Sequence, residues 1–457
     1  MKRLLLIFAV VLVTSCSFDN KTGIWKDGTD INQDYQSPKT ITNNNLNTKY
    51  EDIFTKNKTF NEEIEPLDLY NIRIDIPVKV VNWHEQYAVP TNNISNFSYS
   101  GNKILLSRSS KLSKFSSSKN YSNRNILFYK NNLVSYDQKG TIFIYSLSLN
   151  KKIFEYNFYK KNFKNIDKKI NLIINENILY IADNLGYLYS LNLNDKSIIW
   201  AKNYGIPFRS NLKLANGQIF LANQDNVLYS IDSTTGNKNW QFATSQTFLK
   251  TDFENNFSID LINNNLFFLN TSGELYSINY QNQKINWVLN FRSSAQDGDA
   301  ELFLSQPIVI KKNNLIITTE KKVLSYDAAT ASKNWNLSAE PNFKPIVTLN
   351  HTFVILKNDL LICLENASGN VVWSKNIYTN IIDKKVKKNF QSIIDFKLVN
   401  SEINIFSKKG YLLSFNSKNG NSSYSGRISK KGIGSEVFFL NENMFFFDND
   451  NKLLKFN

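Results

Sequence analysis

The chain has 457 residues, with 54 basic and 39 acidic side chains, and its formal net charge is +15. This length is sufficient for a large buried core or for more than one domain. The lysines are scattered among asparagines and isoleucines and form no long basic block, so we expect no nucleic-acid partner. We interpret the charge as a solvated surface, with attraction to acidic lipid as the minor alternative.

Residues 1–15 have the organisation of an export signal. Lys2 and Arg3 precede an apolar run from Leu4 to Val13, which is too short to span a bilayer comfortably. The sequence Val-Thr-Ser-Cys that ends at Cys16 resembles a bacterial lipobox, in which the cysteine thiol is acylated and becomes the new N-terminus. We therefore predict a lipoprotein signal peptide over 1–15 and a lipidated Cys16. The alternative is an ordinary signal peptide beside an incidental cysteine.

A lipidated Cys16 has consequences for location and for redox chemistry. Ser17, rather than an aspartate, follows the cysteine, which in enteric-type sorting indicates the outer membrane. We predict a lipid-anchored protein on the outer membrane of a Gram-negative bacterium, facing the periplasm. Cys363 is the one other cysteine of the chain, so no intrachain disulfide is expected. Its setting, "LLICLE", is typical of a buried strand, and a packed thiol is favoured over a nucleophile.

The segment 16–75 is polar and rich in asparagine, threonine, lysine and aspartate, with no sustained apolar period. Such a composition cannot bury enough surface to fold alone. We interpret it as a tether between the lipid anchor and a folded body over 76–457. Whether part of "EPLDLYNIRIDIP" docks on that body stays open.

A short motif recurs through the body. "VLYSIDSTTGNKNW", from Val227 to Trp240, predicts two strands around a tight turn, with Trp240 eleven residues after Tyr229. Related copies place an aromatic residue in the same slot at intervals of 38 to 51 residues. Each period carries four short apolar runs and no helical periodicity, which is the pattern of a propeller blade. The body is therefore predicted to be all-β.

The two ends of the body predict how the ring closes. The chain finishes "NKLLKFN", a strand with no turn and no tryptophan after it, whereas "VKVVNW" reaches Trp83 with no such strand before it. If this N-terminal strand completes the last blade, the ring closes without an open edge. The prediction is an eight-bladed β-propeller of four-stranded blades. Its structural blade aromatics are Trp83, Phe154, Trp200, Trp240, Trp287, Trp335, Trp373 and Tyr424.

Two polar stretches interrupt the repeats. We interpret "SRSSKLSKFSSSKNYSN", between Trp83 and Phe154, and "YTNIIDKKVKKNFQ", after Trp373, as loops.

Candidate catalytic residues are few. His84 and His351 are far apart in the sequence, and we interpret both as structural. The acidic run from Asp297 to Glu301 has the chemistry of a cation ligand, but a surface loop needs no such role. The sequence shows no metal-ligand cluster, phosphate loop, nucleophile elbow or catalytic carboxylate pair in a credible context. We expect no catalytic residue, no metal and no cofactor.

Each repeat, with its strand, its Asp/Asn-x-x-x-Gly turn and its tryptophan, resembles the pyrroloquinoline-quinone repeat family over residues 76 to 457. The resemblance implies that the tryptophans pack between blades. Quinoprotein dehydrogenases of this family also carry an adjacent cysteine pair and acidic calcium ligands, and this chain has no adjacent cysteine pair. The repeat alone therefore does not imply a cofactor.

The lipobox, the tether and the eight-bladed ring together resemble the BamB family, lipoproteins of the outer-membrane β-barrel assembly machinery. The resemblance implies a non-catalytic scaffold that docks on the POTRA domains of BamA, with nascent outer membrane proteins as further partners through strand-edge pairing. Two loops match the family pattern for docking. Its candidate partner-binding residues are Ile206, Phe208 and Arg209 in "YGIPFRSN", then Asp252, Glu254 and Asn256 in "KTDFENNFS".

The second of these loops departs from the family pattern, since Asn256 stands where a second acidic residue is expected. The alternative interpretation of the first loop is structural, with Arg209 capping the loop and contacting no partner. Two alternative functions also remain at this stage. One is a periplasmic quinoprotein dehydrogenase with a cofactor in its central channel. The other is a propeller adaptor of a different envelope complex.

Overall fold

The computed structural model describes the backbone of residues 16–18 and 25–27, and then residues 59–66, 72–113, 125–159, 163, 165–246, 255–291, 303–379, 381, 384–390 and 392–457. The chain divides into two units, residues 1–56 and 57–457. In the first unit, β1 (Cys16–Phe18) pairs antiparallel with β2 (Trp25–Asp27). Residues 1–15, for which a signal peptide is predicted, lie outside the described residues.

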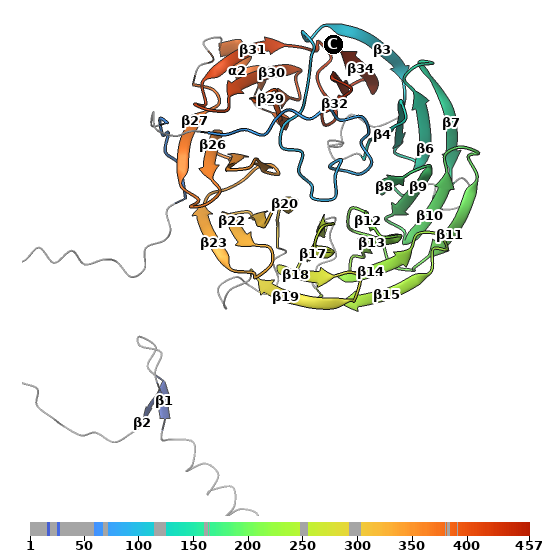
Figure 1. The fold of residues 1–457 in the computed structure, drawn as a ribbon, viewed down its shortest axis with the longest axis horizontal. Helices are drawn as coiled ribbons and strands as arrows, with labels where there is room; N and C mark the ends of the chain where they lie inside the picture. Colours follow the sequence, from blue (N-terminus) through green and yellow to red (C-terminus); the bar gives the residue numbers. More distant parts are fainter. Residues whose placement is uncertain are drawn as a thin grey trace, which may run out of the picture. The chain divides into compact units, whose positions relative to one another are not determined.

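The second unit is an eight-bladed β-propeller, as predicted (Figure 1). Every blade is a four-stranded antiparallel sheet, and the first strand of blades 1 to 7 is the innermost. Blades 1 to 4 consist of β4 (Leu127–Tyr129), β5 (Asn132–Tyr136), β6 (Thr141–Ser146) and β7 (Lys151–Asn157); β8 (Ile170–Asn175), β9 (Ile178–Asp183), β10 (Tyr187–Asn192) and β11 (Ile198–Asn203); β12 (Lys213–Ala215), β13 (Gln218–Ala222), β14 (Val227–Asp232) and β15 (Lys238–Ala243); and β16 (Asn256–Asp260), β17 (Asn265–Leu269), β18 (Glu274–Asn279) and β19 (Lys284–Asn290).

The remaining blades follow the same plan, and the eighth draws its outermost strand from the other end of the body. Blades 5 to 8 consist of β20 (Val309–Lys311), β21 (Asn314–Thr318), β22 (Lys322–Asp327) and β23 (Lys333–Ser338); β24 (Ile346–Val347), β25 (His351–Ile355), β26 (Leu360–Glu365) and β27 (Val371–Asn376); β28 (Ile393–Val399), β29 (Glu402–Ser407), β30 (Tyr411–Asn416) and β31 (Ser422–Arg427); and β32 (Phe438–Leu440), β33 (Asn443–Phe447), β34 (Lys452–Phe456) and β3 (Leu105–Lys111).

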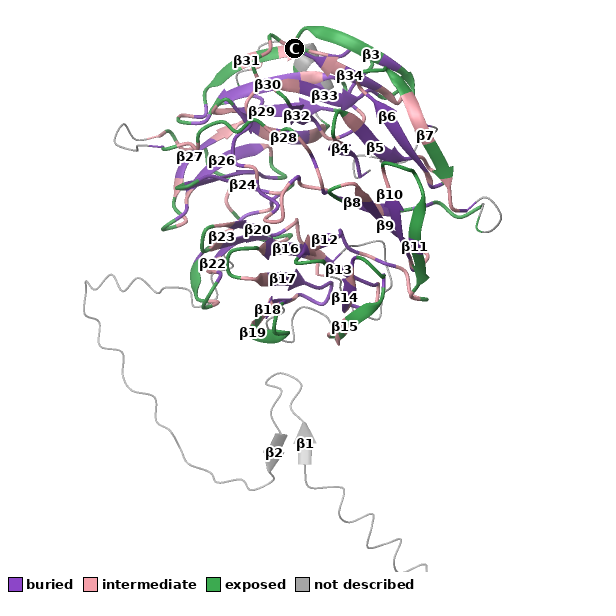
Figure 2. Ribbon diagram, turned by 45° about the vertical axis from the view of Figure 1, so that its right-hand side comes forward, coloured by how far each residue is buried: buried purple, intermediate pink, exposed green. Residues whose placement is uncertain are grey.

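The core lies between neighbouring blades, and its composition follows from the strand patterns. The middle strands β13 and β14 are mainly buried on both faces, whereas the outermost β15 alternates between exposed and half-buried residues. Figure 2 shows this gradient for the whole ring, with buried inner strands and exposed rim strands. A sheet that is covered on both faces favours continuous apolar runs, and a rim strand favours alternation.

Four of the repeat tryptophans link one blade to the next. The indole N–H groups of Trp200, Trp287, Trp335 and Trp373 donate to main-chain carbonyls in the turn between the third and fourth strands of the following blade, at 3.2, 3.1, 2.8 and 3.2 Å. Gly236 in one of these turns has a φ of +69°, and a Cβ there would lie 2.6 Å from the Trp200 ring. The turn glycine therefore provides both the left-handed backbone and the space for the indole.

An N-terminal strand does complete the last blade, but it is β3 and not the segment that ends at Trp83. β3 pairs antiparallel with β34, and Leu105 lies opposite Phe456. The Ser/Lys-rich stretch interpreted as an inserted loop therefore begins inside this closing strand. Trp83 is not on the rim either, because it pairs with Phe128 of the innermost strand β4. Its ring packs edge-on against Phe438 at 5.0 Å.

Residues 78–100, which we call the channel segment, cross the centre of the ring (Figure 1). Main-chain hydrogen bonds join this segment to the innermost strands of several blades. The Ile174 N–H donates to the His84 carbonyl at 2.8 Å, the Ile259 N–H to the Pro90 carbonyl at 2.9 Å, and the Phe97 N–H to the Leu398 carbonyl at 2.9 Å. The centre of the propeller is therefore closed by the chain's own backbone.

Residues 59–66 lie on the rim of the propeller. Ile64 forms an antiparallel bridge with Ser374 of β27, and Phe60 packs against the apolar cluster around Trp335. Docking was left open for residues 65–77, and the structure shows it for part of them: Ile72 is buried against the body, and the Asp75 carboxylate lies 3.1 Å from the Lys311 amine.

The polar stretch after Trp373 carries a short helix, α2 (Lys384–Phe390), where the sequence indicated only a loop. Phe390 is buried and its ring lies 6.1 Å from that of Tyr378, which anchors the polar run on the body. Among the described residues, no helix is long and apolar enough to cross a membrane.

Candidate binding sites on the funnel face

One face of the propeller opens into a funnel with a cavity volume of about 1540 Å³. Many of its lining residues come from the connections between successive blades and from the turns between the second and third strands of a blade, for example Ser305, Lys344, Asn184 and Lys357. We call this side the funnel face. The channel segment supplies lining residues that include Trp83, Gln86, Tyr87 and Asn92, and these form the floor.

The floor is attached to the ring by a buried ion pair. Lys213 on β12 contacts the carboxylate of Glu85, and its amine also donates to the Asn92 side-chain oxygen at 2.6 Å. The Asn92 amide in turn donates to the carbonyls of Phe257 and Ile308, at 2.6 and 2.9 Å. Burial lowers the pKa of Lys213, and the neighbouring Glu85 carboxylate opposes this shift. Such a network is strongly destabilised when one partner is lost, because a buried charge remains.

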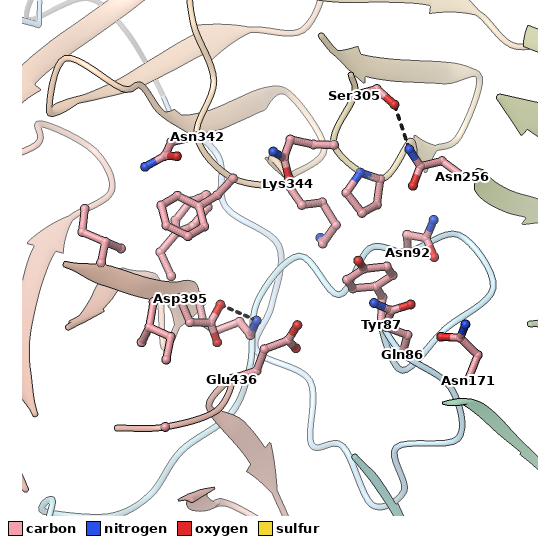
Figure 3. A pocket seen from close by; sticks show the side chains of 18 of the residues that line it. Gln86, Tyr87, Asn92, Asn171, Asn256, Ser305, Asn342, Lys344, Asp395 and Glu436 are labelled. Carbon is pink, nitrogen blue, oxygen red and sulfur yellow. Dashed lines mark hydrogen bonds and ion pairs between the residues drawn. The ribbon is translucent and has the colours of Figure 1, made fainter. Parts of the chain in front are cut away.

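Four charged residues gather on one wall of the funnel. Lys397 on β28 donates to Asp395 at 2.8 Å, and the second oxygen of Asp395 accepts the Val437 N–H at 2.9 Å. Lys344 and Glu436 reach into the same cavity from two different inter-blade loops (Figure 3).

The electrostatics of Lys344 and Glu436 differ from those of an ordinary surface pair. Burial lowers the pKa of Lys344 to about 7, and the nearby Lys397 ammonium adds to this shift. Burial also raises the pKa of Glu436 to about 7, against the attraction of Lys397. Desolvation disfavours the charged form of either group, so both titrate near neutrality. Perturbed groups of this kind that line a cavity are candidates for a binding role.

The predicted docking loop, Tyr204–Ser210, connects blade 2 to blade 3. It belongs to the same class of inter-blade connection that lines the funnel. The Phe208 N–H donates to the Asp183 carbonyl at 3.3 Å, and the Arg209 N–H to the Ala222 carbonyl at 2.9 Å. These bonds fix the loop between two turns, with Ile206 and Arg209 half-buried and the Nε and Nη1 atoms of Arg209 turned away from solvent.

Phe208 is buried, so its side chain is not in a position to contact a partner directly. Its side chain is 3% exposed, and its ring packs against Tyr204 at 5.7 Å and Tyr229 at 6.2 Å. A partner therefore cannot reach this ring in the described conformation. Phe208 was predicted as a partner-binding residue, but its buried ring packs inside the propeller and holds the loop instead.

The second predicted docking loop is described in part. Asp252 and Glu254 lie outside the described residues. Asn256 begins β16 and donates to the Ser305 hydroxyl at 2.7 Å in the funnel wall. The two loops meet through their backbones, since the Asn255 N–H donates to the Arg209 carbonyl at 2.7 Å.

The remaining sequence candidates occupy structural positions. His84 packs against Tyr129, His351 is buried in β25, and burial lowers the pKa of both imidazoles. Cys363 is fully buried in β26, which raises the pKa of its thiol and makes it a poor nucleophile. The run from Asp297 to Glu301 lies in the stretch 292–302, which is outside the described residues.

Sequence reasoning missed the funnel wall. One local signal existed, because Asp395 and Lys397 interrupt the apolar strand "IIDFKLV" on the same face. Lys344 and Glu436 gave no signal, since they lie 92 residues apart in loops that do not repeat.

The comparisons with known proteins agree with this architecture. The model of the family described as "Outer membrane protein assembly factor BamB" matches residues 164–375, which include the loop Tyr204–Ser210. An outer membrane protein assembly factor BamB of Legionella pneumophila (strain Paris) is 32% identical over 85 residues. The chain resembles BamB. That match spans 19% of this chain and 21% of the length of the relative.

Solved structures show the same fold at low identity. BamB from Moraxella catarrhalis superimposes with a TM-score of 0.58 at 10% identity, covering 78% of this chain and 99% of that chain. Quinohemoprotein alcohol dehydrogenase from Comamonas testosteroni gives 0.57 at 8% identity, with 82% and 80% covered. Identities this low show the propeller fold and leave the function to the residues of the site.

The described residues do not fit the quinone-and-calcium chemistry that the enzyme members of the repeat family imply. The two cysteines, Cys16 and Cys363, are not adjacent, and no described group of three His, Cys, Asp or Glu residues is arranged to hold a metal ion. The funnel is large enough for a cofactor, but the described part of its wall offers lysine amines, isolated carboxyls and several amides instead.

Proposed function

We propose that this protein is a non-catalytic scaffold of the outer-membrane β-barrel assembly machinery, which docks on the POTRA domains of a BamA-like protein. The observation that carries the proposal is the BamB-family match over residues 164–375, combined with the position of the loop Tyr204–Ser210 within it. Fold alone would not distinguish this role from that of a dehydrogenase, because both kinds of protein have the same ring.

The docking surface consists of the loop Tyr204–Ser210 and the start of β16. Ile206 supplies an apolar contact and Arg209 a charged one, while buried Phe208 holds the loop in place. An apolar residue beside an arginine at the centre of a contact is the usual composition of a binding hot spot. The backbone bond from Asn255 to Arg209 makes the two loops one surface.

Membrane attachment completes the proposal. Acylation of Cys16 would hold the protein on the periplasmic side of the outer membrane, and the polar stretch that follows would let the propeller reach its partner. A Cys16→Ser variant is expected to move from the membrane fraction to the soluble fraction and to lose incorporation of labelled palmitate.

The docking surface is tested by affinity purification of the tagged full chain from its own cells. The wild-type protein is expected to recover the BamA-like subunit, and Arg209→Glu to recover at least tenfold less, because the charge is reversed at the contact. Lys202→Glu, an exposed change on the rim strand β11 of the same blade, is the matched control and should leave recovery unchanged.

The outcomes separate the role from the site. Failure of the wild-type protein to recover a BamA-like subunit contradicts the proposed function. Equal recovery by the wild-type and the Arg209→Glu proteins contradicts only the placement of the contact.

A further inference from the structure

The inner wall of the ring is a set of sheet edges. In each blade the innermost strand pairs with one neighbour, so its other edge faces the channel. Such an edge presents main-chain N–H and C=O groups to any extended chain that comes near it. The channel segment uses this property at the floor, where Ile259 and Ile310 donate to the carbonyls of Pro90 and Thr91, at 2.9 and 3.2 Å. The ring therefore already binds main-chain carbonyls of one peptide segment, which is its own.

Above the floor, the funnel keeps two ionisable groups without a direct counter-ion. Among the described residues, no carboxylate lies within 4.0 Å of the Lys344 amine, whereas Lys397 is paired with Asp395. The Lys344 amine lies 3.4 Å from the Pro345 carbonyl and 5.6 Å from the centre of the Tyr87 ring. The Glu436 carboxylate likewise has no ion pair within that part of the chain. Both side chains are half-buried, and desolvating such groups without a partner is costly.

The rest of the wall is suited to amide chemistry. Asn171, Asn256 and Asn342 line the same cavity, and their side chains donate and accept hydrogen bonds as a peptide group does (Figure 3). The Tyr87 ring adds an apolar surface at the floor. The volume of about 1540 Å³ exceeds that of most small-molecule pockets, which favours a ligand of several residues.

We propose that the funnel binds the free carboxyl end of a peptide chain, with its terminal carboxylate at Lys344 and its amide N–H donors directed at Glu436. A carboxylate beside Lys344 stabilises the charged amine that burial disfavours, and N–H donors do the same for the Glu436 carboxylate. The asparagine amides of the wall pair with the peptide groups that follow. This site is separate from the docking loop and does not depend on the proposed partner.

The experiment is a calorimetric titration of the detergent-solubilised full chain with trialanine and with trialanine amide. These probes differ only in the terminal charge, so the comparison isolates recognition of the carboxylate. Trialanine is expected to bind, and the amide to bind at least tenfold more weakly.

Three variants locate the site. Lys344→Met and Glu436→Gln are each expected to weaken trialanine binding at least tenfold. Lys357→Met changes a lysine at the funnel rim, beside Glu320, and should bind trialanine as the wild-type protein does. Thermal unfolding of each variant shows that the fold is kept, and since both wall substitutions remove a buried ionisable group, neither should lower the melting temperature.

Three results would overturn the proposal. The first is no binding of trialanine by the wild-type protein up to about 10 mM, which is weaker than the millimolar range of useful recognition. The second is equal binding of the two probes. The third is unchanged trialanine binding by a folded Lys344→Met protein.

Discussion

The rim and the centre of this propeller are built on different principles. At the rim, a repeated tryptophan donates to the turn of the next blade, as Trp200 does to Ser233 and Trp335 to Asn366. At the centre, one non-repeating segment contacts the innermost strands of several blades through single contacts, such as Asn92 with Phe257 and Ile308. Repetition therefore produces the scaffold, and the features that distinguish this protein from other propellers lie where the repeat stops.

The largest expected effect on stability comes from a substitution at the centre of the ring. Lys213→Met leaves the Glu85 carboxylate buried without its partner, and the free energy of unfolding should fall by about 3–5 kcal/mol. The double variant Lys213→Met/Glu85→Met removes both charges and should recover most of this loss. Urea unfolding followed by tryptophan fluorescence measures both. A loss below about 1 kcal/mol in the single variant would show that the floor does not hold the ring.

A matched pair of substitutions tests the rim. The Trp335 N–H donates to the Asn366 carbonyl at 2.8 Å, whereas the Trp240 N–H is buried with no acceptor among the described residues. Trp335→Phe should lower the free energy of unfolding by about 2 kcal/mol, since a hydrogen bond and packing volume are both lost. Trp240→Phe should cost about 1 kcal/mol less, because it removes an unsatisfied donor. Equal losses in urea unfolding would contradict the hydrogen-bonded role of the rim tryptophans.

The funnel wall predicts a smaller, pH-dependent effect. Folding raises the pKa of Glu436 from 4.5 to about 7, so the folded chain holds a proton that the unfolded chain has lost, and stability falls as the pH rises through that window. Folding lowers the pKa of Lys344 from 10.5 to about 7, so stability rises again from pH 7 to 10.5. Charges on Lys397 and Asp395 act on the pKa values of both groups, and Lys213 acts on that of Lys344.

Single substitutions separate these two windows. Glu436→Gln should remove the fall between pH 4.5 and 7, and Lys344→Met the rise above pH 7, as melting temperatures measured at several pH values would show. The double variant should be more stable than the wild-type protein at pH 7, because it removes the cost of desolvating both groups. The gain should be only about 1–2 kcal/mol, since solvent in the funnel screens them. Identical pH profiles in the wild-type and variant proteins would contradict the buried state of the pair.

The blades were predictable from the sequence because their signal is local and repeated. A strand, a turn and an aromatic residue at fixed spacing identify each blade, as Tyr229 and Trp240 do for blade 3. Ring closure was predictable as a principle, since an unpaired half-blade leaves an open edge. The closing strand itself was misplaced. β3 reads "LLSRSSK", and an outermost strand with mostly exposed residues needs neither an aromatic residue nor apolar alternation.

The channel segment and the funnel wall had no comparable signal. Contacts such as that of Asn92 with Ile308 join residues 216 positions apart, and no periodicity in the sequence predicts them. Lys344 and Glu436 come from two different connections and the Asp395–Lys397 pair from β28, and they gather only after the ring has closed. Phe208 shows the opposite error. The family pattern predicted Phe208 as a partner-binding residue of the loop Tyr204–Ser210, but the pattern does not tell which apolar side chain turns inward.

The most direct test of the account is photocrosslinking in cells. A photoreactive amino acid at position 206, in the docking loop, is expected to form a covalent adduct with a BamA-like POTRA protein. The same residue at position 202, on the rim of the same blade, is expected to form none. Adducts at both positions in equal yield, or an adduct at position 202 alone, would contradict the claim that the loop Tyr204–Ser210 is the docking surface.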